Sequence, residues 1–180
     1  MAKIKIGDTQ LNFELPGVDG LKHSIENIQK IKVIIFSCNH CPYAQAWEDR
    51  IVNLQSEFSK DIQIIMISSN DAEQFPDDSF QEMAKRSQEK KFNFPYLYDE
   101  SQEIATLYGA ERTPEVFVFD SLGTLKYHGT IDDNYENESE VEKHFLKEAI
   151  KNIIIEKNPS PSFTEPVGCT IKWKNLNILR

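Results

Sequence analysis

Two cysteines stand three residues apart at the point where a buried strand changes into a helix. Residues 33–36 form an apolar, strand-like run, and Cys38 and Cys41 follow it closely. A helical turn wound from this point would bring the two sulfurs close enough to form a disulfide. The unpaired N–H groups and positive dipole end of such a helix favour a thiolate there. The pattern predicts thiol–disulfide redox chemistry, with a structural thiol pair or half of a metal site as the alternatives.

The residues around the cysteines bear on which sulfur reacts. His40 lies between them, and its protonated ring would stabilise a thiolate and make the disulfide more oxidising; the alternative is a solvated loop histidine. Pro42 favours the first position of a helix, which would make Cys41 the cap residue nearest the helix dipole. Both role assignments stay open. We favour Cys38 as the attacking thiol, because the first cysteine of a C-x-x-C pair is its usual nucleophile.

The surrounding pattern predicts the elements that position this motif. A helix over 44–59 carries an apolar stripe at spacings of four, three and four residues: Trp47, Ile51, Leu54 and Phe58. A second buried strand over 62–67 follows, so the strand, helix and strand form a βαβ unit with parallel strands. Ser79 and Glu82 fit a capping box, which predicts a helix from there to about Lys91.

The second half of the chain continues with alternating elements. A short helix is expected over 103–108, and the strands 115–120 and 124–129 are expected to pair as a hairpin. The acidic segment 131–140 is expected to be a solvated loop. It precedes a helix predicted over 141–156. These elements indicate an α/β protein.

Length and composition limit the class of protein. The 180 residues predict a single domain, 1–180, in which the proline-containing segment 157–180 forms a docked C-terminal tail. The formal net charge of −9 argues against nucleic acid or an anionic membrane surface as a partner. No apolar stretch is long enough to span a membrane, and the start lacks a signal-peptide core. A cytosolic location is therefore expected.

Several short motifs together resemble a known family. They are Gly7-Asp8, residues 13–16, Asp19-Gly20, the run 38–43 and the C-terminal run 168–173. This pattern resembles the peroxiredoxin-like redoxins of the AhpC/TSA superfamily, in particular a subgroup that carries a C-x-x-C motif. The resemblance implies a thioredoxin fold: a three-layer α/β/α arrangement with a mixed central sheet, an N-terminal β-hairpin extension and a helical insertion.

The resemblance also assigns a second wall to the site. Pro114 stands directly before a buried strand, as does the cis-proline of thioredoxin folds. In those folds the proline packs against the C-x-x-C, and the residue before it, here Thr113, offers backbone hydrogen bonds to an extended peptide substrate. An ordinary trans proline at a strand start is the alternative. Thioredoxins also carry a buried carboxylate on the strand before the motif, but Lys32 stands near that position here.

The first predicted function is that of a thiol–disulfide oxidoreductase. Cys38 attacks a disulfide, a mixed disulfide forms, and Cys41 resolves it. The expected partners are a protein disulfide substrate, or a small-molecule peroxide or disulfide, and a thiol reductant that the sequence does not identify. No metal or organic cofactor is needed.

Two other functions compete with it. A thiol peroxidase is suggested because Cys41-Pro42 matches the end of the peroxiredoxin motif T-x-x-C-P, although Cys38 replaces the threonine. Arg112 is the candidate activating arginine, and its ordinary interpretation is a surface residue. A metal-binding protein is the other alternative, since zinc or copper(I) would suit four side chains by ligand type: Cys38, Cys41, Cys169 and either His40 or His128.

Cys169 in the tail is the third cysteine of the chain. Its two interpretations are a third redox thiol and a buried small hydrophobic side chain. We predict that it lies within reach of the active site.

Overall fold

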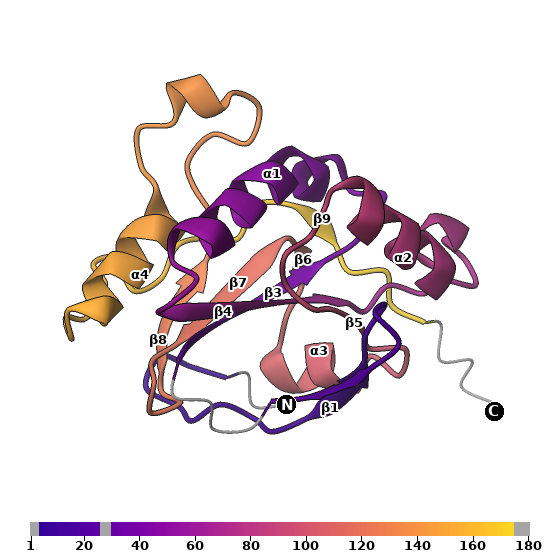
Figure 1. The fold of residues 1–180 in the computed structure, drawn as a ribbon, viewed down its shortest axis with the longest axis horizontal. Coiled ribbons are helices and arrows are strands. Elements are labelled where there is room, and N and C mark those ends of the chain that lie inside the picture. Colours follow the sequence, from indigo (N-terminus) through magenta and orange to yellow (C-terminus); the bar gives the residue numbers. More distant parts are fainter. Residues whose placement is uncertain (1–3, 26–29, 175–180) are drawn as a thin grey trace.

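A computed structural model describes residues 4–25 and 30–174 of the chain. Figure 1 shows the arrangement of its elements. The strands are β1 (Glu14–Pro16), β2 (Lys22–Ser24), β3 (Ile31–Ser37), β4 (Ile62–Ser68), β5 (Tyr96–Tyr98), β6 (Arg112–Thr113), β7 (Glu115–Phe119), β8 (Leu125–Gly129) and β9 (Cys169–Thr170). The α-helices are α1 (Pro42–Glu57), α2 (Phe80–Glu89), α3 (Glu103–Tyr108) and α4 (Phe145–Ile154). Two 3-10 turns, η1 (Pro76–Asp78) and η2 (Glu138–Glu140), complete the set.

A five-stranded sheet of mixed direction forms the centre, in the order β5-β4-β3-β7-β8. Strand β3 pairs in parallel with β4, and the intervening helix α1 makes the predicted βαβ unit. On its other side β3 pairs antiparallel with β7, which in turn pairs with β8. The central position of β3 explains its sequence, because a strand covered on both faces is apolar throughout.

Helices cover both faces of this sheet, so the molecule has three layers (Figure 1). Successive side chains of a strand point to opposite faces. Val33 and Ile35 accordingly pack against α1 and α4, whereas Ile34 and Phe36 pack against α3 and the N-terminal segment. Strands β1 and β2 form the predicted N-terminal hairpin on the second face. The three layers and the mixed central sheet match the thioredoxin fold that the sequence resemblance implies.

The predicted insertion between β4 and β5 consists of η1 and α2. Ser79 is the N-cap residue of α2, as expected, but its side chain makes no capping hydrogen bond. The predicted capping box is therefore absent. The insertion is instead held by an ion pair to α1: the Arg86 guanidinium donates to both carboxylate oxygens of buried Glu48, at 2.9 and 2.6 Å.

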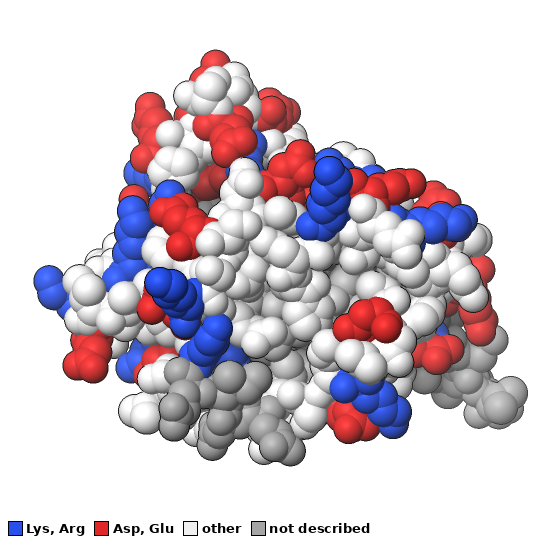
Figure 2. Space-filling model, in the orientation of Figure 1, with Lys and Arg blue, Asp and Glu red and all other residues white. Residues whose placement is uncertain are grey.

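Helix α4 begins at Phe145, four residues later than predicted. The backbone of the preceding segment is bonded to the loop that follows β8, since Glu142 N donates to the Asp133 side chain and Asp133 N donates to the Lys143 carbonyl. These bonds hold the segment outside the helix. Acidic side chains gather on the raised loop after β8 (Figure 2), and residues 133–140 are exposed or partly exposed, in agreement with the predicted solvated segment. The prediction was wrong for Ile131 and Asp132, which are buried, and Asp132 accepts a hydrogen bond from Trp47.

None of the helices among the described residues is long and apolar enough to cross a membrane.

The ion pair between α2 and α1 generates a stability prediction. Arg86→Met leaves the Glu48 carboxylate buried beside only Lys90, 3.9 Å away, so we expect the free energy of unfolding to fall by about 3 kcal/mol. The double variant Glu48→Gln/Arg86→Met should recover part of this loss, because no buried charge remains. Urea unfolding measures both. Lys85→Met, at an exposed position on the same helix, is the control, and an equal loss there would contradict the prediction.

Candidate functional site

The C-x-x-C motif occupies the junction between β3 and α1. Cys38 follows the last residue of β3, and Cys41 is the N-cap residue of α1. Pro42 is the first residue of the helix, where its missing N–H would have had no intrahelical partner. Both thiols are free and buried, with 1% of Cys38 and none of Cys41 exposed. Cys41 is therefore the sulfur nearest the positive end of the helix.

The turn between β6 and β7 forms the opposite wall. The Thr113–Pro114 peptide bond is cis, as the resemblance implies. Thr113 contacts both sulfurs: its hydroxyl lies 3.3 Å from Cys38 Sγ, and its carbonyl oxygen lies 3.1 Å from Cys41 Sγ. Strands β3 and β7 are adjacent and antiparallel, so the C-terminal end of β3 lies beside the N-terminal end of β7. This pairing brings the cysteines and Thr113 to the same end of the sheet.

Cys169 completes a cluster of three cysteines. Strand β9 pairs antiparallel with β6, and this register sets Cys169 opposite Thr113. Its half-buried side chain packs against Cys38, Cys41 and Ala44. The predicted proximity of Cys169 to the motif is confirmed. Residues 175–180, the end of the predicted tail, lie outside the described residues.

The two motif thiols have opposite electrostatic environments. A hydrogen bond from the Cys38 thiol lowers the pKa of Cys41, and the Cys169 thiol and the Ala44 N–H act in the same direction. The Thr113 carbonyl opposes them, because it accepts a proton from a thiol and repels a thiolate. For Cys38, the same bond to Cys41, burial and the Asp78 carboxylate all raise the pKa. The structure therefore favours Cys41 as the thiolate and Cys38 as the protonated partner.

A buried carboxylate organises the turn between the cysteines. Asp78, from η1, is wholly buried and accepts hydrogen bonds from the backbone N–H groups of Asn39 and His40, at 2.7 and 3.2 Å. Its other oxygen lies 2.5 Å from His40 Nδ1 and accepts a further bond from the Asn70 side chain at 2.7 Å. His40 also stacks on Phe75. His40 is thus a positioned residue, and not the free loop histidine of the alternative interpretation.

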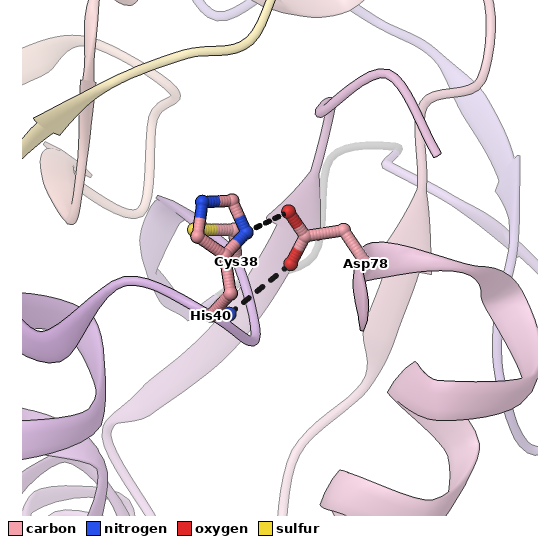
Figure 3. A group of neighbouring side chains, drawn as sticks. All are labelled: Cys38, His40 and Asp78. Carbon is pink, nitrogen blue, oxygen red and sulfur yellow. Dashed lines mark hydrogen bonds and ion pairs between the residues drawn. The ribbon is translucent and has the colours of Figure 1, made fainter. Parts of the chain in front are cut away.

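Figure 3 shows the His40 ring in front of Cys38, with Asp78 at its side. Metal-ligating atoms of these three residues lie within 4.8 Å of one another, and they form the one such group in the described part of the chain. The predicted metal set of Cys38, Cys41, Cys169 and a histidine is not such a group: His40 is grouped with Asp78 instead of Cys41 and Cys169, and His128 bonds Glu115 at 2.7 Å. The oxygens of Asp78 already accept four hydrogen bonds, so the carboxylate is better suited to orient His40 than to bind a metal directly.

Two further residues that the sequence drew attention to, Arg112 and Lys32, do not contribute to the site. Arg112 is exposed, and its guanidinium reaches the Gly168 carbonyl at 3.4 Å. Lys32 is fully buried at the start of β3, where its ammonium donates to Gln10 at 2.8 Å. Burial lowers the pKa of Lys32. The carboxylate at this site comes from Asp78, which sequence reasoning missed, because the run Asp77-Asp78 indicated only the start of a helix.

A mixed sheet between two helical layers, with paired thiols at the N-terminus of a helix and a cis-proline opposite, defines a thioredoxin-fold protein with a dithiol site. The profile of the AhpC/TSA family matches residues 6–128. The chain belongs to that family.

Solved structures support the fold. An uncharacterized conserved protein from Geobacillus kaustophilus is 34% identical, with a TM-score of 0.89 over 95% of this chain and 93% of its own. A hypothetical protein from Sinorhizobium meliloti is 27% identical, with a TM-score of 0.90 over 97% of each chain. A secreted disulfide oxidoreductase from Mycobacterium tuberculosis is 17% identical, with a TM-score of 0.55 over 63% of this chain and 79% of its own, and shows a shared fold alone. A search of curated proteins found no match.

The hydrogen bond between the motif thiols generates a pH prediction. Cys38→Ala removes the donor to Cys41, whereas Cys38→Ser keeps a hydroxyl at that position. We expect the pH of half-maximal alkylation of Cys41 by iodoacetamide to be higher in the alanine variant by about one unit. In both variants Cys41 is the one cysteine of tryptic peptide 33–50, so mass spectrometry follows it alone. Identical pH profiles of alkylation in the two variants would show that the hydrogen bond from Cys38 does not lower the pKa of Cys41.

Proposed function

We propose that this protein is a thiol–disulfide oxidoreductase whose redox pair is Cys38 and Cys41. One observation carries the proposal: two free thiols with opposite pKa shifts meet at a helix N-terminus and face the Thr113–Pro114 cis peptide. A paired thiolate and thiol is the arrangement that disulfide exchange requires. Membership of the AhpC/TSA family supports thiol chemistry in general.

The electrostatics support one assignment of the two roles. Cys41, the sulfur with the lowered pKa, attacks a substrate disulfide, and one substrate sulfur leaves as a thiolate. Cys38 then loses its proton, attacks the Cys41 sulfur of the mixed disulfide and releases the second substrate thiolate, leaving a Cys38–Cys41 disulfide. This order reverses the one that we favoured from sequence. This order also suggests a role for the His40–Asp78 pair, because the pair lies next to Cys38, the thiol that must lose a proton.

The other predicted functions gain no support from the site. A peroxidase needs an arginine that reaches the reactive sulfur, and Arg112 instead contacts the Gly168 carbonyl. The predicted metal set of three cysteines and a histidine is not found as a candidate group among the described residues, and the group that is found contains Asp78, whose oxygens are already hydrogen-bonded. We propose that the substrate is a protein disulfide or a small disulfide, and that a cytosolic thiol reductant regenerates the dithiol.

Trapping of the mixed disulfide tests the function and the roles together. We remove Cys169 to prevent it from resolving the intermediate, and compare Cys38→Ser/Cys169→Ser with Cys41→Ser/Cys169→Ser. The first variant keeps the activated thiolate and should retain a mixed disulfide with a model disulfide substrate. The second should retain about tenfold less, because the pKa of Cys38 is raised. Cys169→Ser alone should form a reversible Cys38–Cys41 disulfide in glutathione buffers, and its failure to do so would refute the proposed function.

The His40–Asp78 pair generates a rate prediction. In Cys169→Ser, a thionitrobenzoate group attached to Cys41 reports resolution by Cys38 through its absorbance on release. We expect His40→Gln to slow this release near pH 7 by about tenfold or more, since a positioned base is lost. The difference should shrink at high pH, where hydroxide takes the proton. Lys85→Gln removes a basic side chain from the exposed face of α2 and is the control. Equal rates for both substitutions would exclude a role for His40 in proton transfer.

A further inference from the structure

The C-terminal segment occupies the edge of the site where a substrate chain would dock. Backbone pairing between β9 and β6 sets Cys169 opposite Thr113 and Thr170 opposite Arg112, and Ile171 N donates to the Glu111 carbonyl at 3.0 Å. Pairing with the backbone of an exposed strand is a general way in which proteins hold an extended peptide. In this chain the extended peptide is its own, and it presents a cysteine.

The fit of this segment is close. A Cβ atom on Gly168 would lie 2.2 Å from the Thr113 carbonyl oxygen and 2.6 Å from the Thr113 carbonyl carbon. Real Cβ atoms do not approach backbone so closely, so glycine is required for the segment to reach the cis peptide. The sequence Gly168-Cys169 thus combines the residue that permits contact with the residue that can react.

Hydrogen bonds beyond the strand fix the register. Asp71 N donates to the Lys172 carbonyl at 2.8 Å, and Lys172 N donates to the Asn70 side chain at 2.9 Å. Asn70 also donates to Asp78, the carboxylate that orients His40. The tail is therefore bonded to the same network that positions the motif, and Cys169 is held in place from both sides.

The Cys169 thiol is the neighbour of Cys41. The Cys169 thiol forms a hydrogen bond with the Cys41 thiol. Among the described residues, no hydrogen bond joins Cys169 to Cys38. Cys169 is also the most exposed of the three cysteines, since Cys38 and Cys41 are buried.

We propose that Cys169 is a third redox-active thiol, and that the docked tail acts as a built-in substrate which exchanges the Cys38–Cys41 disulfide for a Cys41–Cys169 disulfide. This inference rests on the proposed redox function of the motif. The Cys169 thiolate attacks Cys41 Sγ; the Cys41–Cys169 bond forms and the Cys38–Cys41 bond breaks. The electron pair leaves with the Cys38 sulfur, which takes up the proton that Cys169 lost. The step is an isomerisation and needs no further oxidant.

The exchange moves the disulfide to an accessible position. An external thiolate can attack the half-buried Cys169 sulfur, and Cys41 then leaves as a thiolate. A thiol with a low pKa is the better leaving group in such a step. The third cysteine would thereby connect the buried Cys38–Cys41 pair to a thiol reductant in solution. Glutathione, a small thiol, is the reductant used to test this step.

Peptide mapping tests the proposal directly. Trypsin releases Cys38 and Cys41 on peptide 33–50 and Cys169 on peptide 158–172. The full-length variants are oxidised in glutathione buffers, trapped with acid, alkylated and separated as monomers without reductant. Cys38→Ser should yield the two peptides joined by a disulfide. Cys41→Ser should need an oxidised-to-reduced glutathione ratio about tenfold higher for the same yield, because the Cys169 thiol hydrogen-bonds with Cys41 and, among the described interactions, not with Cys38.

A second pair of variants tests the role of the tail fit. In the Cys38→Ser background, Gly168→Ala should lower the yield of joined peptides about tenfold, because the added Cβ would meet the Thr113 carbonyl. Val167→Ala, at the preceding exposed position, should leave the yield unchanged. Circular dichroism checks that each variant is folded. A yield that is unaffected by Gly168→Ala would overturn the docked-substrate inference.

The outcomes separate the two proposals. If Cys169→Ser forms the Cys38–Cys41 disulfide but neither the wild type nor Cys38→Ser joins the two peptides, the third thiol is refuted and the oxidoreductase stands. If Cys169→Ser forms no Cys38–Cys41 disulfide, the proposed function fails. If Cys38→Ser and Cys41→Ser join the peptides equally readily, Cys169 reacts without the specific partner that the geometry requires, and the proposal is wrong.

Discussion

The site depends on where the Cys41 sulfur lies: between the first turn of α1 and the Thr113 carbonyl. The helix terminus and the hydrogen bonds from Cys38 and Cys169 favour a thiolate, whereas the carbonyl and burial oppose it. A hydrogen bond to an ionised acceptor is stronger than one between neutral groups, so the donors around Cys41 outweigh burial and the repulsive carbonyl, and the pKa of Cys41 is lowered. One proton is thereby displaced towards Cys38, and the two thiols become chemically unequal although both are buried.

The fold supplies this geometry from three distant parts of the chain. The antiparallel pairing of β3 and β7 brings Thr113 to the cysteines. The insertion brings Asp78 beneath the turn, and the Arg86–Glu48 ion pair holds that insertion to α1. Lys32 lies on β3, where thioredoxins carry a carboxylate, but it is bonded to Gln10. The acidic group of this site therefore enters from the insertion, and it acts on the turn and on His40.

Local patterns in the sequence predicted the elements that depend on local physics. The apolar runs of β3 and β4, the helical stripe from Trp47 and the proline at the helix start identified the βαβ unit and its motif. The predicted start of α4 was wrong, because the hydrogen bonds between Asp133 and residues 142–143 hold this segment in a non-helical conformation. Asp78 was missed for a similar reason: its partners His40 and Asn39 are 38 and 39 residues away, and no spacing rule connects them.

In the proposed exchange, the tail connects the buried thiols with solvent. Tail contacts with the body include β9 pairing, the bonds of Lys172 and the packing of buried Ile171. Segments near a chain terminus open at a lower free energy than the core of a domain. Under the proposed function, a substrate that reaches Cys41 would displace the segment that carries Cys169 and take its place beside β6. Competition between tail and substrate for the pairing with β6 would then couple access to the site with the redox state of the third cysteine, because a Cys41–Cys169 disulfide ties the tail in place.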